Sequence, residues 1–190
     1  EINIGDWSSD VCSSDLRLWI FWWWPWQADE AGTKKLQSRS ALHCMKNIHK
    51  SVLIWYSPDE MFRLVTDVAR YPEFLPWCDQ ARVIEHDAQG MLAEIGIRLG
   101  GIQQSFTTRN THEEGRSVGM ALVKGPFSNL QGTWRFVPVG DGAQRACKVE
   151  LDLEYGFSSA TLAALVGPVF DKIAASLVDA FVKRAETVYG

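Results

Sequence analysis

Apolar and polar side chains alternate along much of the chain between residues 80 and 155. The alternation is cleanest in residues 147–155, CKVELDLEY, where apolar residues occupy every second position and Lys, Glu or Asp the positions between. A period of two is typical of a strand with one buried and one solvated face, as in an antiparallel sheet. With glycine-containing turns between segments, we predict strands at roughly 80–88, 91–99, 102–111, 117–123, 130–138 and 145–155.

A strand and two short helical segments are predicted before this run of hairpins. Residues 46–56, KNIHKSVLIWY, are rich in branched side chains and alternate as a strand does. Ser57 and Glu60 have the spacing of a capping box, and Pro58 stands at the first helical position. The helix that they begin is expected to end near Arg70, and residues 71–78, YPEFLPWC, to form a turn or kinked helix between two prolines.

The C-terminal segment predicts one long amphipathic helix. Its apolar side chains recur at steps of three and four residues, and Gly167–Pro168 predicts that the helix either begins near Pro168 or is kinked there. The recurring residues are Leu162, Val166, Val169, Phe170, Ile173, Leu177, Phe181 and Val188. An apolar helix face and an apolar sheet face together give a two-layer α+β domain.

Residues 1–44 differ in character from the rest. They hold six of the nine tryptophans and the near-duplicate SSDVC/SSDL, while residues 45–190 have an ordinary composition. The apolar run at 18–26 contains a proline and is about half the ~20 residues that a membrane span needs, and the leader lacks the basic start of a signal peptide. We expect 1–44 to be a non-native or disordered leader, with an aromatic membrane anchor as the alternative, and 45–190 to be the domain.

Charge and reactive residues exclude several classes of function. Of 19 basic and 23 acidic residues, 4 and 6 lie in the leader, which leaves 45–190 a formal net charge of −2 and no reason to expect DNA as a partner. Cys78 and Cys147 are far apart in the sequence, and the four histidines have no metal-ligand spacing, so we expect no metal and no required cofactor. No paired acid and base or nucleophile constellation suggests catalytic residues.

Four stretches in order resemble a known family. YPEFLPWCDQARV (71–83), SFTTRN (105–110), KGPFSNLQGTWRF (124–136) and LAALVGPVFDKIAASLVDAFVKRAETVYG (162–190) resemble the coenzyme-Q-binding proteins, also called the ribosome-association toxin A family, of the START-like polyketide cyclase superfamily. The resemblance covers 45–190. It implies a helix-grip fold, in which a curved antiparallel sheet of about seven strands wraps around a long C-terminal helix in the order β-α-α-β6-α.

The resemblance also implies a function without catalysis. The expected role is a carrier of ubiquinone or a similar polyprenyl quinone that supports respiratory electron transport, in the cytoplasm or at the periphery of the inner membrane. A toxin that binds the large ribosomal subunit and blocks subunit association is the first alternative. A polyketide cyclase-like enzyme is the second, although a shared fold is weak evidence for a shared reaction.

Three groups of residues are candidates for the ligand site, with ordinary core packing as the competing interpretation. Ligand pockets are mostly apolar with a few polar groups. The cavity candidates are Leu99, Phe106, Phe127, Leu130, Trp134, Phe136, Phe170, Ile173, Leu177 and Phe181. Phe74, Leu75 and Trp77, on the turn between two prolines, are candidates for an exposed apolar portal, with Gly125–Pro126–Phe127 as the opposite lip. Arg98, Gln104 and Arg109 are the polar candidates for a quinone head group.

Overall fold

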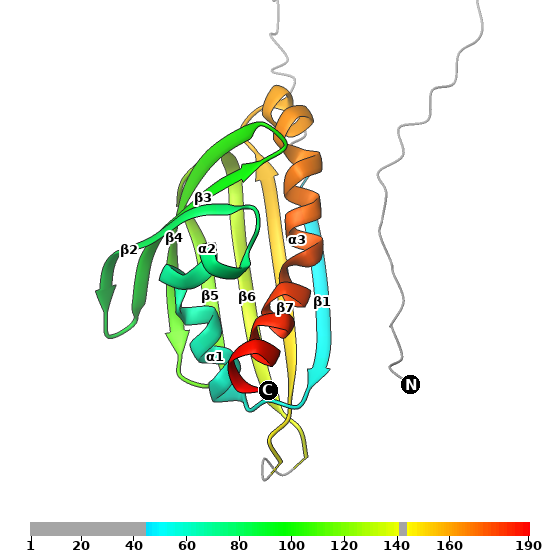
Figure 1. Cartoon of the computed structure of the whole chain (residues 1–190). Helices are drawn as coiled ribbons and strands as arrows, with labels where there is room; N and C mark the ends of the chain where they lie inside the picture. The colour runs from blue at the N-terminus through cyan, green and yellow to red at the C-terminus, as the bar shows by residue number, and fades with distance from the viewer. Residues whose placement is uncertain (1–44, 141–143) are drawn as a thin grey trace, which may run out of the picture. The chain divides into compact units, whose positions relative to one another are not determined.

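Seven antiparallel strands form one curved sheet in the computed structural model, which describes residues 45–140 and 144–190 (Figure 1). The strands are β1 (Lys46–Ile54), β2 (Cys78–Asp87), β3 (Gly90–Leu99), β4 (Ile102–Glu113), β5 (Ser117–Lys124), β6 (Phe127–Pro138) and β7 (Cys147–Phe157). Their order in the sheet is β1-β7-β6-β5-β4-β3-β2. The predicted helix-grip fold class is confirmed, and the expectations about residues 1–44 lie outside the described residues.

The strands from β2 to β7 pair with their neighbours in sequence, and β1 closes the far edge by pairing with β7. The predicted strand boundaries agree with the structure to within about three residues. The largest difference is β6, which begins at Phe127 rather than at residue 130, because a register shift after Phe127 lets it continue the pairing with β7. Such a bulge adds a residue that strict alternation does not anticipate.

Helix α1 (Pro58–Thr66) has the predicted capping box, since the Ser57 Oγ accepts from the Glu60 N–H at 3.3 Å and a Glu60 carboxylate oxygen accepts from the Ser57 N–H at 2.8 Å. The helix ends four residues before the predicted Arg70. Asp67 leaves the helical region with φ −82° and ψ 62°, and a 3₁₀ turn, η1 (Val68–Arg70), follows. The short helix α2 (Tyr71–Phe74) then confirms the helical alternative for the turn between the prolines.

Helix α3 (Ala160–Tyr189) begins at the N-cap Ser159 and contains Pro168 in its interior, so it does not start at the proline. Thirty residues at ~1.5 Å each make it ~45 Å long, and in Figure 1 it runs along the sheet from end to end. By length and composition alone it could also cross a membrane. Its buried face, which includes Phe170, Ile173 and Phe181, packs against the sheet and accounts for this composition.

The core therefore lies between the concave face of the sheet on one side and α1, α2 and α3 on the other. Every second residue of β7, from Cys147 to Phe157, is buried on that concave face. The intervening residues from Lys148 to Glu154 are charged and lie on the convex face, as the alternation predicts. Any internal ligand site has to be formed by this concave layer.

Candidate functional site

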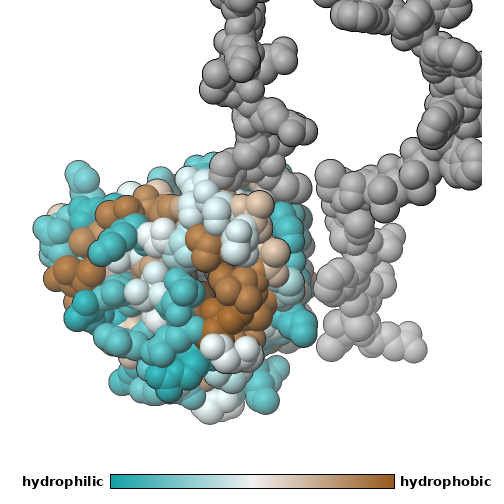
Figure 2. Space-filling view, turned by 90° about the horizontal axis from the view of Figure 1, so that it is seen from above, coloured by the Kyte–Doolittle hydropathy of each residue, from teal (hydrophilic) through white to brown (hydrophobic). Residues whose placement is uncertain are grey.

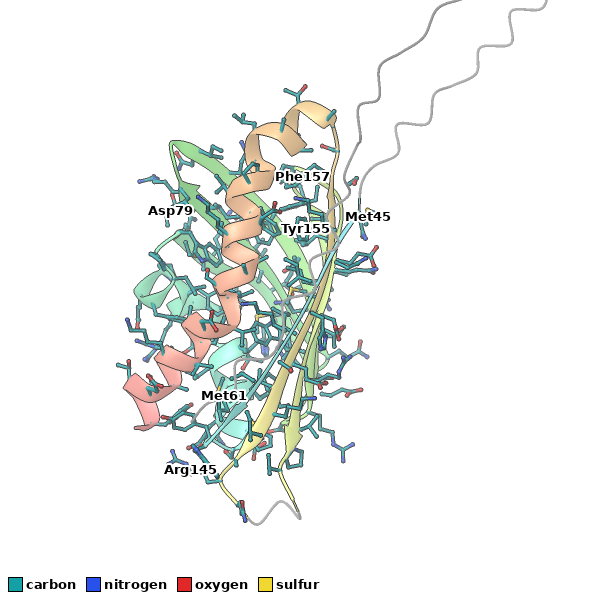
Figure 3. The ribbon with its side chains drawn as sticks, turned by 90° about the vertical axis from the view of Figure 1, so that its right-hand side faces the viewer. Met45, Met61, Asp79, Arg145, Tyr155 and Phe157 are labelled. Carbon is teal, nitrogen blue, oxygen red and sulfur yellow. The ribbon has the colours of Figure 1, made fainter. Side chains whose placement is uncertain are left out.

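An aromatic cluster occupies the space between the sheet and α3. The Trp134 ring on β6 lies 5.2 Å from the Phe181 ring on α3, and Phe170 lies 4.8 Å from Phe127 and 4.7 Å from Tyr155. The residues of these contacts come from strands and helix alike, so side chains bridge the two layers. Figure 3 shows Tyr155 between β7 and α3.

All ten cavity candidates belong to this one apolar cluster. Leu99 and Leu177 are half-buried, and the other eight are buried: Phe106, Phe127, Leu130, Trp134, Phe136, Phe170, Ile173 and Phe181. Their rings contact one another across the two layers. The structure thus brings the ten residues together, and their contact with a ligand stays a prediction.

The expected exposure of the portal residues is wrong. Leu75 is completely buried and Trp77 is 7% exposed, while Phe74 is half-buried with its ring 5.2 Å from that of Phe181. The segment forms α2 and the turn that follows it, and its apolar side chains pack into the core cluster instead of lying on an open loop. As a result, the segment closes one part of the domain and offers no apolar lip to solvent.

Two of the three polar candidates are also on the wrong face. Arg98 lies on the convex face of β3, where its guanidinium is 3.1 Å from the Asp79 carboxylate, and Arg109 lies on the convex face of β4, where it pairs with Asp87. A guanidinium gains more from water and a carboxylate partner than from an apolar interior. Gln104 points to the concave side with Phe106 and lines a cleft.

That cleft opens where β4 separates from β5. The pairing of these strands ends at Thr107 and Lys124, with a register shift beside it, so residues 102–106 of β4 have no partner on that side among the described residues. The opening has a volume of about 620 Å³. Its lining combines inner residues with convex-face residues: Gln104, Phe106, Gly125, Pro126, Ser158 and Leu162 with Arg82, Ile84, Glu94, Ser105, Thr107 and Lys124.

The predicted lip loop, Gly125–Pro126–Phe127, forms one wall of the cleft. A Cβ atom on Gly125 would lie 2.7 Å from the Phe106 Cβ, so only glycine permits this close approach of the loop to β4. Phe127 turns inward and is buried. The loop therefore belongs to the mouth of the domain, opposite the beginning of α3.

Charged residues line only the convex side of this cleft, and the side where α3 begins is apolar. No charged residue occurs in 155–170, in 99–108 or in 125–134, which include the end of β7 and the start of α3, the β3–β4 hairpin, and the cleft loop with the first part of β6. Leu165 is 62% exposed there. Figure 2, which views this end, shows a hydrophobic area where α3 begins.

A row of polar side chains runs along the concave face of β4 beyond Phe106. Thr108 is 2% exposed, Asn110 is 8% exposed and His112 is half-buried. The Asn110 Oδ1 and the His112 Nε2 are buried without a hydrogen-bond partner in the described part of the chain. Burial, and secondarily the neighbouring His86, lowers the pKa of His112, while Asp87 opposes the shift. This row was not among the residues predicted from the sequence, in which its only signal is the two-residue spacing from Phe106.

The remaining buried titratable groups have clear structural roles. The Tyr155 hydroxyl donates to Asp171 at 2.5 Å, Lys46 donates to the other carboxylate oxygen at 2.5 Å, and burial raises the pKa of Tyr155. Burial also raises the pKa of both Cys78 and Cys147 to about 11. Among residues 45–140 and 144–190, no three His, Cys, Asp or Glu side chains are grouped to hold a metal ion.

Comparisons with known proteins agree with this architecture. Residues 54–182 match the family described as polyketide cyclase / dehydrase and lipid transport. The ribosome association toxin RatA of Vibrio cholerae is 44% identical over 146 residues, an alignment that covers 77% of this chain and 99% of RatA. Coenzyme Q-binding protein COQ10 homolog B, mitochondrial, of Xenopus laevis is 25% identical over 142 residues, 74% of this chain and 58% of that protein.

A solved structure has the same fold. The Zhui aromatase/cyclase of Streptomyces sp. R1128 superposes with a TM-score of 0.66 at 14% identity, over 75% of this chain and 94% of that one. At this identity the likeness concerns the fold alone. It therefore carries no information on whether this chain catalyses a reaction.

Proposed function

Because the chain belongs to the START-like family of polyketide cyclase, dehydrase and lipid transport proteins, we propose that it binds a polyprenyl quinone such as ubiquinone between its sheet and α3. The observation that carries the proposal is the continuous apolar layer on the concave face, which reaches from the buried aromatic cluster to the cleft beside Gln104 and Leu162. A long, largely apolar ligand needs such a layer, because burial of apolar surface supplies most of its binding energy.

The apolar side of the cleft, where α3 begins, is the proposed entry. A lipid leaves a bilayer at least cost along an uncharged surface, and the start of α3, the β3–β4 hairpin and the cleft loop lack charges, whereas Arg82, Glu94 and Lys124 line the convex side of the cleft. Lys124, on the rim of the cleft, suits the anionic headgroups of a membrane surface. The proposal therefore includes a cytoplasmic protein in peripheral contact with the inner membrane.

The proposal is for binding without catalysis and without a required cofactor. The titratable side chains that face the core are few, and Tyr155 is held in a hydrogen bond to Asp171. The raised pKa of Tyr155 keeps its hydroxyl protonated and disfavours it as a base. The COQ10 homolog B name supports the choice of a quinone.

Ribosome association is a second candidate, favoured by the RatA name of a relative that aligns over 99% of its length. Contact with ribosomal RNA requires clustered unpaired cations. On the convex face, Arg82, Arg98 and Arg135 each pair with a carboxylate. The proposed quinone site is internal and a ribosome would have to contact the outer surface, so each candidate function can be tested separately.

The test of the quinone proposal begins with protein purified without detergent from a bacterium that makes ubiquinone. Organic extraction and mass spectrometry should find the quinone at near-stoichiometric amounts. Leu177→Glu, which places a charge beside the apolar cluster, should lose the quinone, whereas Leu53→Glu at a position 62% exposed should retain it. Circular dichroism checks that both variants are folded.

Two results would reject the proposal. One is wild-type protein that is folded but neither carries ubiquinone nor takes it up from vesicles. The other is equal retention by the two variants. Co-sedimentation of the wild-type protein with the large ribosomal subunit at physiological salt, unchanged in Leu177→Glu, would support the second candidate instead.

A further inference from the structure

We propose that Thr108, Asn110 and His112, the polar row on the concave face of β4, bind the oxygen atoms of the ligand's head group. This inference rests on the proposed function and specifies it. The head group would be a compact ring that carries carbonyl or hydroxyl oxygens, with the tail directed toward the cleft. Arg98 and Arg109 are excluded from this role because they lie on the other face of the sheet.

The burial of the row without partners is the first argument. Asn110 is more than nine-tenths buried, and its Oδ1 meets no donor among the residues that the structure describes. The His112 Nε2, two residues along the same face, also lacks a partner. Native proteins hydrogen-bond nearly all of their buried polar atoms, so two adjacent exceptions call for a missing partner.

The surroundings are the second argument. Asn110 stands opposite Met91 on β3 and Met120 on β5, and the Phe62 ring of α1 lies edge-on 5.8 Å from the His112 ring. These neighbours are apolar and satisfy no polar atom. Apart from His86 and Asp87 near His112, the row is thus a polar strip with apolar walls, which is the composition of a site that orients a mostly apolar ligand.

Spacing and protonation fit a small ring with oxygens on two sides. Alternate residues on one strand face are ~6.6 Å apart, so Asn110 and His112 can reach opposite sides of one ring. The titratable groups that face His112 are His86, whose ring centroid is 6.4 Å away, and Asp87. Since burial lowers the pKa of His112, the neutral imidazole predominates at pH 7, and it can donate one hydrogen bond to a carbonyl oxygen.

The position of the row along β4 also suits a long ligand. Asn110 is six residues from Gln104 at the cleft, a distance of ~20 Å along the strand. Phe106 and the apolar cluster lie between them on the same face. A head group held at Asn110 therefore leaves an isoprenoid tail in contact with apolar side chains as far as the mouth.

The test is a titration of the full chain with ubiquinone-2, in which the change in tryptophan fluorescence reports binding. Asn110→Leu keeps the approximate size of the side chain and removes its polar atoms, and should weaken ubiquinone-2 binding at least tenfold. Asn47→Leu makes the same change at an exposed position of β1 and should leave binding unaltered. Squalene, which has isoprenoid units but no oxygen, should bind the wild type and Asn110→Leu equally.

The stability of the ligand-free protein gives a second measurement. If the role of Asn110 is to bind a ligand, Asn110→Leu removes an unpaired buried amide and should raise the melting temperature of the ligand-free protein by a few degrees. If Asn110 instead serves the fold, the variant should melt lower. Thr108→Val, which preserves side-chain shape, is the second variant if Asn110→Leu fails to fold, and should also weaken ubiquinone-2 binding.

The outcomes separate the two proposals. Wild-type protein that does not bind ubiquinone-2 rejects the proposed function and the head-group site with it. Wild-type binding that Asn110→Leu and Thr108→Val leave unchanged overturns the head-group site alone. Equal weakening of squalene and ubiquinone-2 binding also overturns it, because the row would then affect the apolar layer rather than the head group.

Discussion

Replacement of Phe181 by alanine tests whether the space between the sheet and α3 is filled as the structure describes. The Phe181 ring is 1% exposed and lies 5.2–5.3 Å from three other rings, those of Tyr71, Phe74 and Trp134. Truncation of a buried Phe to Ala costs about 3–5 kcal/mol. Because aromatic pairs add about 0.5–1.5 kcal/mol each beyond area burial, we expect Phe181→Ala to lie at the upper end, about 4–5 kcal/mol.

The assay is equilibrium urea unfolding of the ligand-free protein, with circular dichroism as the probe of unfolding. Leu165→Ala is the matched control, since Leu165 is on the same helix but 62% exposed, and it should change the free energy of unfolding by less than about 0.5 kcal/mol. The slope of the free energy of unfolding against urea concentration should be the same in both variants. A loss below about 1 kcal/mol for Phe181→Ala would refute the packing, and would mean that the ring lines an open space.

Three further predictions concern other parts of the domain. The hydrogen bond from Arg145 lowers the pKa of Glu60 to about 2, so this carboxylate stabilises the fold above about pH 4.5 and loses the effect toward pH 2. The difference in melting temperature between the wild type and Arg145→Gln should therefore shrink from pH 4.5 to pH 2. A constant difference over this range would contradict the prediction. Cys78 and Cys147 should resist iodoacetamide at pH 8 in the native protein and react in urea, because burial raises the pKa of both thiols. Peptide mass spectrometry measures the labelling, and a native protein labelled as fast as the protein in urea would contradict this prediction. Gly125→Ala should lower the free energy of unfolding in urea by about 1–3 kcal/mol, because the added Cβ would collide with Phe106 of β4. An unchanged free energy of unfolding would exclude that close approach.

The fold was predictable because most segments have one unambiguous period. In residues 147–155 of β7 the apolar and charged residues alternate without a break, and the steps of three and four residues in α3 fit only a helix. The end of α1 was not predictable in the same way. No proline or glycine marks Asp67, and only its dihedral angles in the folded chain show that the helix stops there.

The site was harder to predict because alternation fails where both faces of a strand are polar. In residues 105–112, SFTTRNTH, Phe106 is the only apolar side chain, so Arg109 and Asn110 are equally plausible from composition. A shift of one residue moves every side chain to the opposite face. The buried position of Phe106 fixes the register and puts Asn110 inside and Arg109 outside, which the sequence pattern did not decide.

The concave and convex faces of the sheet carry different residues, and each face could serve a different function. This helps to explain how relatives with one fold can have names as different as a ribosome association toxin and a coenzyme Q-binding protein. In our proposal a ligand between the sheet and α3 contacts concave residues such as Asn110, whereas a ribosome could contact only the outer surface. On the convex face, arginines such as Arg135, which pairs with Glu150, are already neutralised, so phosphate contacts there would first have to break ion pairs. Interior variants should therefore affect quinone binding alone. If such a variant also abolished co-sedimentation with ribosomes, the ligand would have to control the outer surface, and the two activities would be coupled.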